Sequence, residues 1–268
     1  MKKPLAAALL VAGLAGCGAT YQVAQPVQGP IVGAPPGPAA AAPARRSAAA
    51  GVADYRAAAL RIEREAQRMC REARPDGSGK TCDYEFRLVD DPRIGPNAFQ
   101  TIGPDGRPVV AMTTQLVAVT DNADEIAFIL GHEAGHHIAD HISKSRTQAM
   151  TGALVLGTLA TLGNASPDVV NDMMNMGASL GGRAYSQSYE LEADMLGAYI
   201  SARAGYDPER GAKVFSRPEL SAGGGLLSTH PASAQREATV AETSAEIRRQ
   251  RAAGQTPTPA RTARSAWY

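Results

Sequence analysis

Hydrophobic positions recur at helical spacing in several parts of the chain. Over residues 52–74 the apolar side chains fall on one stripe with Arg and Glu between them, which predicts an amphipathic helix. That stripe consists of Tyr55, Ala59, Ile62, Ala66 and Met69. Further helices are expected over 123–143, from Pro167 onward, over 189–204 and over 231–251. Asp121 or Asn122 is suited to cap the helix that starts at residue 123.

Two segments before that helix have the pattern of β-strands. Residues 83–90 place Tyr84, Phe86 and Leu88 on one face, and residues 109–114 form a second, more apolar strand after a Pro-Asp-Gly turn. Few strands among many helices indicate an α+β fold with a small sheet. Because strand 109–114 stands just before the helix from residue 123, we expect it at an edge of the sheet, open to an extended peptide; the alternative is a plain core strand.

Residues 149–163 form an uncharged, apolar run. Fifteen residues are short for a membrane-spanning helix, so a buried helix or a membrane-facing one is expected. Gly152, Gly157 and Gly163 suit close helix packing, which favours burial.

The first residues are typical of an export signal. Lys2 and Lys3 precede a short apolar stretch, and Leu14-Ala15-Gly16-Cys17 resembles the bacterial lipobox, in which the Cys becomes the lipidated first residue. We therefore expect a signal peptide at 1–16 and a lipid on Cys17. The alternatives are an ordinary secretory signal with a chance Cys, or a short membrane anchor. No Asp follows Cys17, which by resemblance favours the outer membrane, facing the periplasm.

Composition divides the remainder of the chain. Residues 17–50 are rich in Pro, Ala and Gly and are expected to be an extended, lipidated tether. Residues 51–250 hold the folded domain, and 251–268 are expected to be a disordered tail. With Cys17 lipidated, Cys70 and Cys82 remain, and in an oxidising compartment they predict a disulfide, two buried thiols being the alternative. Lys and Arg (27) nearly balance Asp and Glu (26), so nothing indicates a nucleic-acid partner.

One motif carries chemistry. His132-Glu133-Ala134-Gly135-His136 is an HExxH sequence in an expected helix. Residues four apart are offset by only about 40° around a helix, so both imidazoles can reach one Zn²⁺. Glu133 can then accept a proton from a metal-bound water. The motif also occurs by chance on helix surfaces, but the apolar residues before it indicate a buried helix.

A catalytic zinc needs a third protein ligand. Glu190 and Asp194 again stand one helical turn apart, which suits Glu190 as that ligand and Asp194 as the acceptor for the second ring N–H of a ligand His. Glu192 between them reads as part of a charged helix face; an alternative assignment makes it the ligand. His137 and His141 point away from the ligand face and are not assigned to the metal.

These residues resemble those of the HtpX-like and BepA-like gluzincin peptidases, a family that includes the CAAX prenyl endopeptidases and LoiP-like lipoproteins. The shared motifs are HExxH, then E-x-E-A-D at 190–194, together with Asn97-Ala98-Phe99, Ala204-Gly205-Tyr206-Asp207-Pro208 and T-H-P-x-x-x-x-R at 229–236. They cover roughly residues 52–250. The resemblance implies a helix-rich zincin domain with a small mixed sheet and a central active-site helix.

The resemblance also implies roles for His230 and Arg236. Both would lie in the active site near the fourth zinc position and could stabilise the oxyanion. In BepA-like relatives the matching His can occupy the open position, which makes the resting enzyme latent. Two departures stand out: Ser186-Gln187-Ser188-Tyr189 lacks the Arg that often precedes the ligand Glu, and the segment from Asp207 to His230 is short.

The expected function is a zinc metalloendopeptidase with one Zn²⁺ per chain, tethered to the outer membrane and acting on misfolded or misassembled envelope proteins. An alternative is a latent, zinc-bound, chaperone-like factor that works with the outer-membrane assembly machinery. A third is a non-catalytic lipoprotein that binds no stoichiometric zinc.

Overall fold

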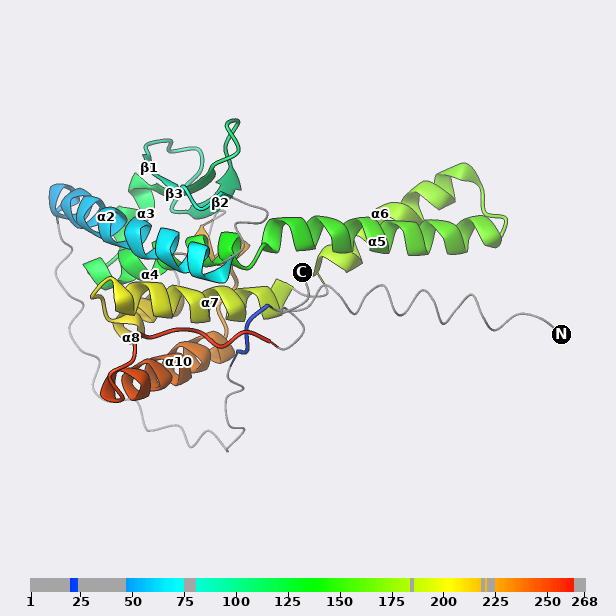
Figure 1. Ribbon diagram of the computed structural model, residues 1–268. Coiled ribbons are helices and arrows are strands. Elements are labelled where there is room, and N and C mark those ends of the chain that lie inside the picture. Colours follow the sequence, from blue (N-terminus) through cyan, green and yellow to red (C-terminus); the bar gives the residue numbers. More distant parts are fainter. Residues whose placement is uncertain are drawn as a thin grey trace, which may run out of the picture. The chain divides into compact units, whose positions relative to one another are not determined.

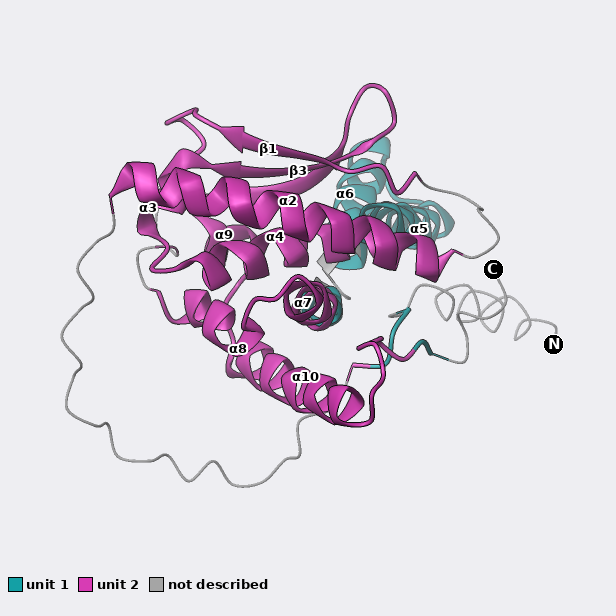
Figure 2. Ribbon diagram, turned by 60° about the vertical axis from the view of Figure 1, so that its left-hand side comes forward, with its two compact units in different colours: residues 1–22, 139–192, 261–268 teal, residues 23–138, 193–260 magenta. Residues whose placement is uncertain are grey.

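The computed structural model describes residues 20–23, 47–74, 81–183, 186–217, 220 and 225–262. The chain forms two compact units, residues 1–22, 139–192 and 261–268 in the first and residues 23–138 and 193–260 in the second (Figure 2). Helix α7 (Ser186–Arg203) begins in the first unit and continues into the second. The expected signal peptide, Cys17 and most of the expected tether lie outside the described residues.

The second unit contains a three-stranded mixed sheet. Its strands are β1 (Glu85–Val89), β2 (Ala98–Ile102) and β3 (Pro108–Thr113), in the order β1-β3-β2. Strand β3 pairs parallel with β1 and antiparallel with β2, and all six of its residues are buried. The prediction that strand 109–114 is an edge was therefore wrong. In the described part of the sheet the edges are β1 and β2, and β2 was not predicted as a strand.

Two long helices of this unit, α2 and α4, pack against the sheet and against each other. Helix α2 (Ala48–Ala73) is capped by the Ser47 side chain and buries the predicted stripe. Helix α4 (Ala123–Ile138) starts where Asn122 Oδ1 accepts hydrogen bonds from the next two free amides, those of Asp124 and Glu125. From Asp124 to Ile138 every residue of α4 except His136 is buried. This is the central helix that the sequence led us to expect (Figure 1).

The second unit is completed by short helices and one long one. Helix α3 (Thr114–Val119) joins β3 to α4, and α10 (Ala234–Ala252) follows the short helical turns. Those turns are α8 (Pro208–Gly211), the 3-10 helix η2 (Ala212–Ser216) and α9 (Leu226–Thr229).

Helices α4 and α7 approach each other at glycines. A Cβ added to Gly135 would lie 3.1 Å from the carbonyl oxygen of Ala193, and one added to Gly197 would lie 2.9 Å from the amide nitrogen of His132. Gly131 makes the same kind of contact with Gly197. The two helix backbones are therefore in direct contact on both sides of His132, which fixes that residue relative to α7.

The first unit contains a long helical hairpin, α5 (His141–Leu162) and α6 (Pro167–Arg183) (Figure 1). The expectation that residues 149–163 are buried was wrong, because Met150, Leu154 and Leu162 are 67%, 63% and 75% exposed. None of the helices in the described ranges is long and apolar enough to cross a membrane. The expected helix 123–143 is also divided, since Asp140 adopts a left-handed conformation (φ 61°) between α4 and α5.

Parts of the expected tether and tail are ordered in the first unit. Tyr21 is only 3% exposed and pairs with Arg261 in an isolated antiparallel bridge. The amide of Thr262 donates to the carbonyl oxygen of Thr20 at 3.0 Å. Composition could not reveal this, because the order comes from contacts between residues more than 200 positions apart.

Cys70 and Cys82 form a disulfide with a Cα–Cα distance of 5.6 Å. Cys70 is fully buried in the last turns of α2, and Cys82 stands shortly before β1. The bond thus joins α2 to the entry of the sheet.

Candidate metal centre

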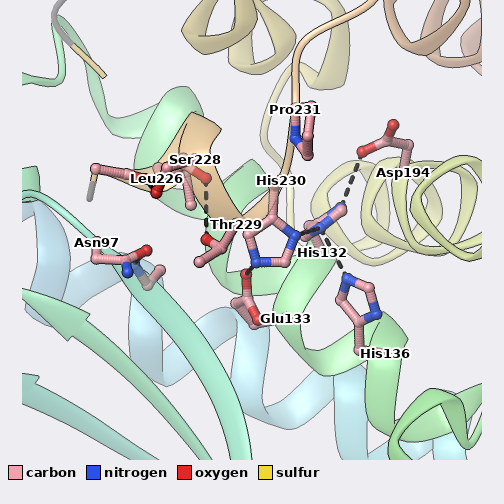
Figure 3. A network of polar contacts seen from close by, with 12 residues as sticks. Asn97, His132, Glu133, His136, Asp194, Leu226, Ser228, Thr229, His230 and Pro231 are labelled. Atoms are coloured by element: carbon pink, nitrogen blue, oxygen red, sulfur yellow. Dashed lines mark hydrogen bonds and ion pairs between the residues drawn. The ribbon is translucent and has the colours of Figure 1, made fainter. Parts of the chain in front are cut away.

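The centre is built on α4, where His132 and His136 stand four residues apart on one face. Their Nε2 atoms are 3.0 Å from each other (Figure 3). His132 is 3% exposed, whereas His136 is the one residue of the buried part of α4 with partial access to solvent. The predicted helical spacing therefore brings the two imidazoles together.

His230 reaches the same place from the end of α9. Its Nδ1 lies 3.2 Å from Nε2 of His132, and its Nε2 lies 3.4 Å from Oε1 of Glu133 (Figure 3). Backbone hydrogen bonds fix His230 in this position. The amide of His230 donates to the carbonyl oxygen of Leu226, and the amide of Leu226 donates to the carbonyl oxygen of Pro96, just before β2. The T-H-P sequence is thus joined to the strand that follows Asn97.

Glu190 completes a group of four donors. Helix α7 carries it one turn before Asp194, and a carboxylate oxygen of Glu190 lies within 4.8 Å of ring nitrogens of His132, His136 and His230. Three imidazoles and a carboxylate match the donors that zinc prefers. In tetrahedral coordination with bonds of about 2.0–2.1 Å, neighbouring donor atoms stand about 3.3 Å apart. The nitrogen–nitrogen distances of 3.0 and 3.2 Å fit such an ion.

Asp194 orients His132. Its Oδ1 lies 2.8 Å from Nδ1 of His132, and the carboxylate is completely buried. A neutral imidazole that donates through Nδ1 keeps a lone pair on Nε2. Asp194 therefore directs the Nε2 lone pair of His132 toward the other donors, as the sequence predicted for its place one turn after Glu190.

Arg236 supports this arrangement instead of facing a substrate. Its guanidinium donates two hydrogen bonds of 2.6 Å to the Asp194 carboxylate and one of 2.9 Å to the carbonyl oxygen of His230. It is 2% exposed and stacks 4.0 Å from the ring centroid of Phe215. The expectation that Arg236 stabilises an oxyanion is therefore revised, because these contacts make it a residue that positions Asp194 and His230.

Glu133 is the buried carboxylate next to the metal ligands. It is 1% exposed, and among the described residues its Oε1 accepts no hydrogen bond within normal distance, with His230 Nε2 at 3.4 Å. A buried carboxylate oxygen without a donor normally has a functional reason. Its position beside the four-donor group suits acceptance of a proton from a water molecule there.

The two other histidines of this region have separate partners. Nε2 of His137 lies 2.9 Å from the carbonyl oxygen of Thr81, and its ring packs edge-on against Tyr84. Nε2 of His141 lies 3.0 Å from Oε2 of Glu192. Both were expected to lie off the ligand face, and neither belongs to the group of four donors.

Glu192 is the residue whose role the sequence analysis missed. It is not part of a solvated helix face but fully buried, and it is not in the donor group either. Its Oε1 accepts hydrogen bonds from the amides of Thr20 and Tyr21 at 2.6 and 2.7 Å. Burial lowers the pKa of its partner His141, although the Glu192 carboxylate acts in the opposite direction. The sequence signal that could have indicated burial is that both neighbours of Glu192, Leu191 and Ala193, are apolar.

Comparison with known proteins agrees with this geometry. The model of peptidase family M48 matches residues 56–244. The chain belongs to peptidase family M48. The matched segment thus contains the sheet, helices α4 and α7 and His230, and the resemblance seen in the sequence motifs is confirmed.

Relatives of this M48 chain are named as proteases. The mitochondrial metalloendopeptidase OMA1 of Arabidopsis thaliana is 33% identical over 181 residues, 65% of this chain and 35% of that protein. OMA1 of Saccharomyces cerevisiae is 32% identical over 166 residues, 57% and 45% of the two chains. The beta-barrel assembly-enhancing protease of Yersinia pestis is 31% identical over 136 residues, 47% and 26%. The matches span less than half the length of each of these relatives.

Proposed function

We propose that this chain is a zinc-dependent metalloendopeptidase. The observation that carries the proposal is the convergence of His132, His136, Glu190 and His230, with the buried Glu133 beside them. His132, His136 and Glu190 would hold the ion. When bound, Zn²⁺ would supply Lewis acidity and lower the pKa of a water molecule.

The residues of the chain would then perform the proton transfers. Glu133 accepts a proton from the water whose oxygen attacks the peptide carbonyl carbon. It later gives that proton to the amine nitrogen as the C–N bond breaks. Asp194 and Arg236 keep His132 in the tautomer that presents Nε2 to the centre. The edge strand β2 offers its backbone to an extended peptide.

Casein digestion with the Glu133→Gln variant tests the mechanism. Glutamine keeps the shape of the side chain but cannot accept the proton, so we expect proteolysis to fall by at least about a thousandfold. Zinc content by metal analysis should stay near one per chain. Wild-type activity in Glu133→Gln would refute the assignment, whereas loss of both zinc and fold would show only that the variant is damaged. Glu237→Gln, on the exposed part of α10, serves as the control.

A second candidate function rests on His230. If its Nδ1 is a fourth zinc ligand, no position is left for water, and the protein would be a latent, zinc-bound assembly factor. The distance of 3.2 Å between His230 Nδ1 and His132 Nε2 favours this state. The same casein assay separates the two: His230→Ala raises proteolysis if the imidazole blocks the ion and lowers it if the imidazole assists the reaction.

We further propose that the protein is a lipoprotein of the bacterial outer membrane, facing the periplasm and acting on misfolded or misassembled envelope proteins. The lipobox-like sequence before Cys17, the disulfide and the relatives named for beta-barrel assembly support this. Mass spectrometry of the N-terminal peptide should show a diacylglycerol-modified Cys17 after removal of residues 1–16. An unmodified N-terminus that begins before Cys17 would exclude the anchor.

A further inference from the structure

Exposed apolar side chains are concentrated on the α5–α6 hairpin. In the described residues, eight of the ten large apolar side chains that are most exposed belong to these two helices. They are Met150, Leu154, Leu159 and Leu162 on α5 and Val169, Met174, Met176 and Leu180 on α6. Single exposed apolar residues are ordinary on a protein surface, but a concentration of this kind marks a surface that binds something.

The reason for this exposure is the way in which the two helices pack. A Cβ added to Gly152 would lie 2.0 Å from the carbonyl oxygen of Gly177, and one added to Gly181 would lie 2.2 Å from that of Gln148. The backbones of α5 and α6 are therefore in contact through small residues. This close approach leaves little room between the helices at Gly152 and Gly181, and farther along the Met174 side chain packs against Gly157. Most of the other large side chains of the pair face outward.

The distribution of charge indicates what the hairpin binds. No Asp, Glu, Lys or Arg occurs between Arg146 and Asp168, a stretch that includes most of α5. On α6, Val169, Met176 and Leu180 lie within about 40° of one another, and Asp168 and Asp172 lie to one side of this stripe. Helix α6 therefore has an apolar stripe, and α5 is uncharged around most of its length with exposed apolar side chains on several sides. Such a pair is suited to the interface of a lipid bilayer.

The start of the described chain places a membrane next to this hairpin. The amides of Thr20 and Tyr21 bind Glu192, and the Thr20 hydroxyl accepts a hydrogen bond of 2.6 Å from Lys144 in the first turn of α5. Cys17 is only three residues before Thr20, a reach of about 10 Å. A lipid on Cys17 would therefore hold the root of α5 about 10 Å from the bilayer, while the 22 residues of α5 extend about 33 Å.

We propose that the α5–α6 hairpin is a lipid-binding surface that lies in the headgroup and upper acyl region of the membrane that carries Cys17. The location of that membrane rests on the lipid anchor proposed above. The apolar side chains would bind lipid by themselves, without the acyl chains and without proteolysis. A shallow apolar pocket between the helices, lined by Leu154, Leu162, Val170 and Met174, offers a place for acyl segments.

Vesicle flotation of a non-acylated protein tests this binding. The mature chain, residues 17–268 with Cys17→Ser, is exported behind the signal of a soluble periplasmic protein and mixed with vesicles of phosphatidylethanolamine and phosphatidylglycerol. We expect it to float with the vesicles. The double variant Leu154→Glu/Leu180→Glu should lower the vesicle-bound fraction at least about tenfold, because it places two charges on the apolar surface.

Leu60→Glu is the matched control, since Leu60 is 68% exposed on α2, outside the hairpin. It should float like the parent protein, and circular dichroism should show that all variants are folded. Failure of the parent protein to float, or flotation of the hairpin variant like the parent, would overturn the proposal. So would a dimer in solution that the hairpin variant dissociates, because a second copy would then cover the surface. The hairpin variant and its parent protein should digest casein at the same rate. A loss of vesicle binding can therefore be distinguished from a loss of proteolysis.

Discussion

At the scale of single residues, Arg236 shows how one buried cation organises a metal centre. It binds the Asp194 carboxylate with two donors and the His230 carbonyl oxygen with a third. Asp194 in turn holds Nδ1 of His132. One guanidinium thus links two of the candidate metal ligands, and it lies on the Nδ1 side of the His132 ring.

The Arg236→Lys variant tests this role. Lysine keeps the charge but cannot make the two-donor contact with Asp194, so we expect zinc affinity to fall about 10- to 100-fold, as is usual for residues that orient a metal ligand. Competition with a fluorescent zinc chelator measures the affinity. Arg248→Lys, an exposed ion-pair change, is the control. Lost activity with unchanged zinc affinity would instead assign Arg236 to the reaction itself.

Tyr55 carries a second residue-scale prediction, on stability at alkaline pH. Burial raises the pKa of its phenol above the usual 10.0, and burial also raises the pKa of Tyr199 to about 12. The folded state therefore keeps these protons when the unfolded state would release them. Below pH 10 the phenols are protonated in both states, and the folded protein has its full stability. Above pH 10 the unfolded chain releases these protons more readily than the folded protein, so the free energy of unfolding should fall as the pH rises.

The Tyr55→Phe variant should reduce that fall. The Tyr55 hydroxyl is buried and accepts or donates no hydrogen bond within the described residues. Its removal should leave the stability at pH 8 unchanged or raise it by about 1 kcal/mol. Urea unfolding at pH 8 and pH 10.5 gives both quantities. A loss of more than 2 kcal/mol at pH 8 would mean that the hydroxyl has a structural partner.

The sequence predicted these residues unevenly, for a physical reason. His132, His136, Glu190 and Asp194 could be assigned because helical periodicity determines which side chains share a face. The partners of Glu192 and Arg236 lie 171 and 42 residues away along the chain. No local pattern encodes such contacts, so Glu192 was interpreted as a solvated charge, and the oxyanion role expected for Arg236 came only from the family resemblance.

At the scale of elements, helices were predicted better than the sheet. The burial stripe of α2 and the capped start of α4 follow from local spacing. The strand order does not follow from it. Strands β1 and β3 are neighbours in the sheet and pair parallel, although β2, which the sequence did not reveal, lies between them along the chain. The hairpin was misjudged for a related reason. Gly152 and Gly157 do make the expected close contacts, whereas Gly163 does not, and such contacts leave large neighbouring side chains exposed.

The crossing of α4 and α7 gives an element-scale prediction. Gly135→Ala would place a methyl group 3.1 Å from the carbonyl oxygen of Ala193, so the helices must move apart. We expect a loss of about 1–3 kcal/mol in unfolding free energy, with weaker zinc binding because α7 carries Glu190 and Asp194. Denaturant unfolding and chelator competition measure the two effects. Gly163→Ala, where the added methyl meets only ordinary 3.4 Å contacts, should change stability by less than about 0.5 kcal/mol. Equal effects of the two substitutions would contradict the close-packing argument.

At the scale of the whole molecule, the candidate metal centre collects its donors from α4, α7 and the end of α9. An ion that binds only the folded state stabilises it by about 2.7 kcal/mol at a concentration a hundred times its dissociation constant. Treatment with a chelator should therefore lower the unfolding temperature, and added zinc should restore it. The Glu190→Gln variant should show a smaller shift in differential scanning calorimetry. An unfolding temperature that is the same with and without the chelator would argue against a bound metal.

The contact between Thr20 and Thr262 has a practical consequence for handling the protein. The two ends of the described chain are fixed at one spot, next to the residue expected to enter the bilayer. A purification tag or fluorescent reporter added after Tyr268 would start only six residues beyond Thr262, within a reach of about 20 Å of the contact with Thr20. A comparison of vesicle binding by the chain with and without such a fusion would reveal whether the added domain competes with the anchor.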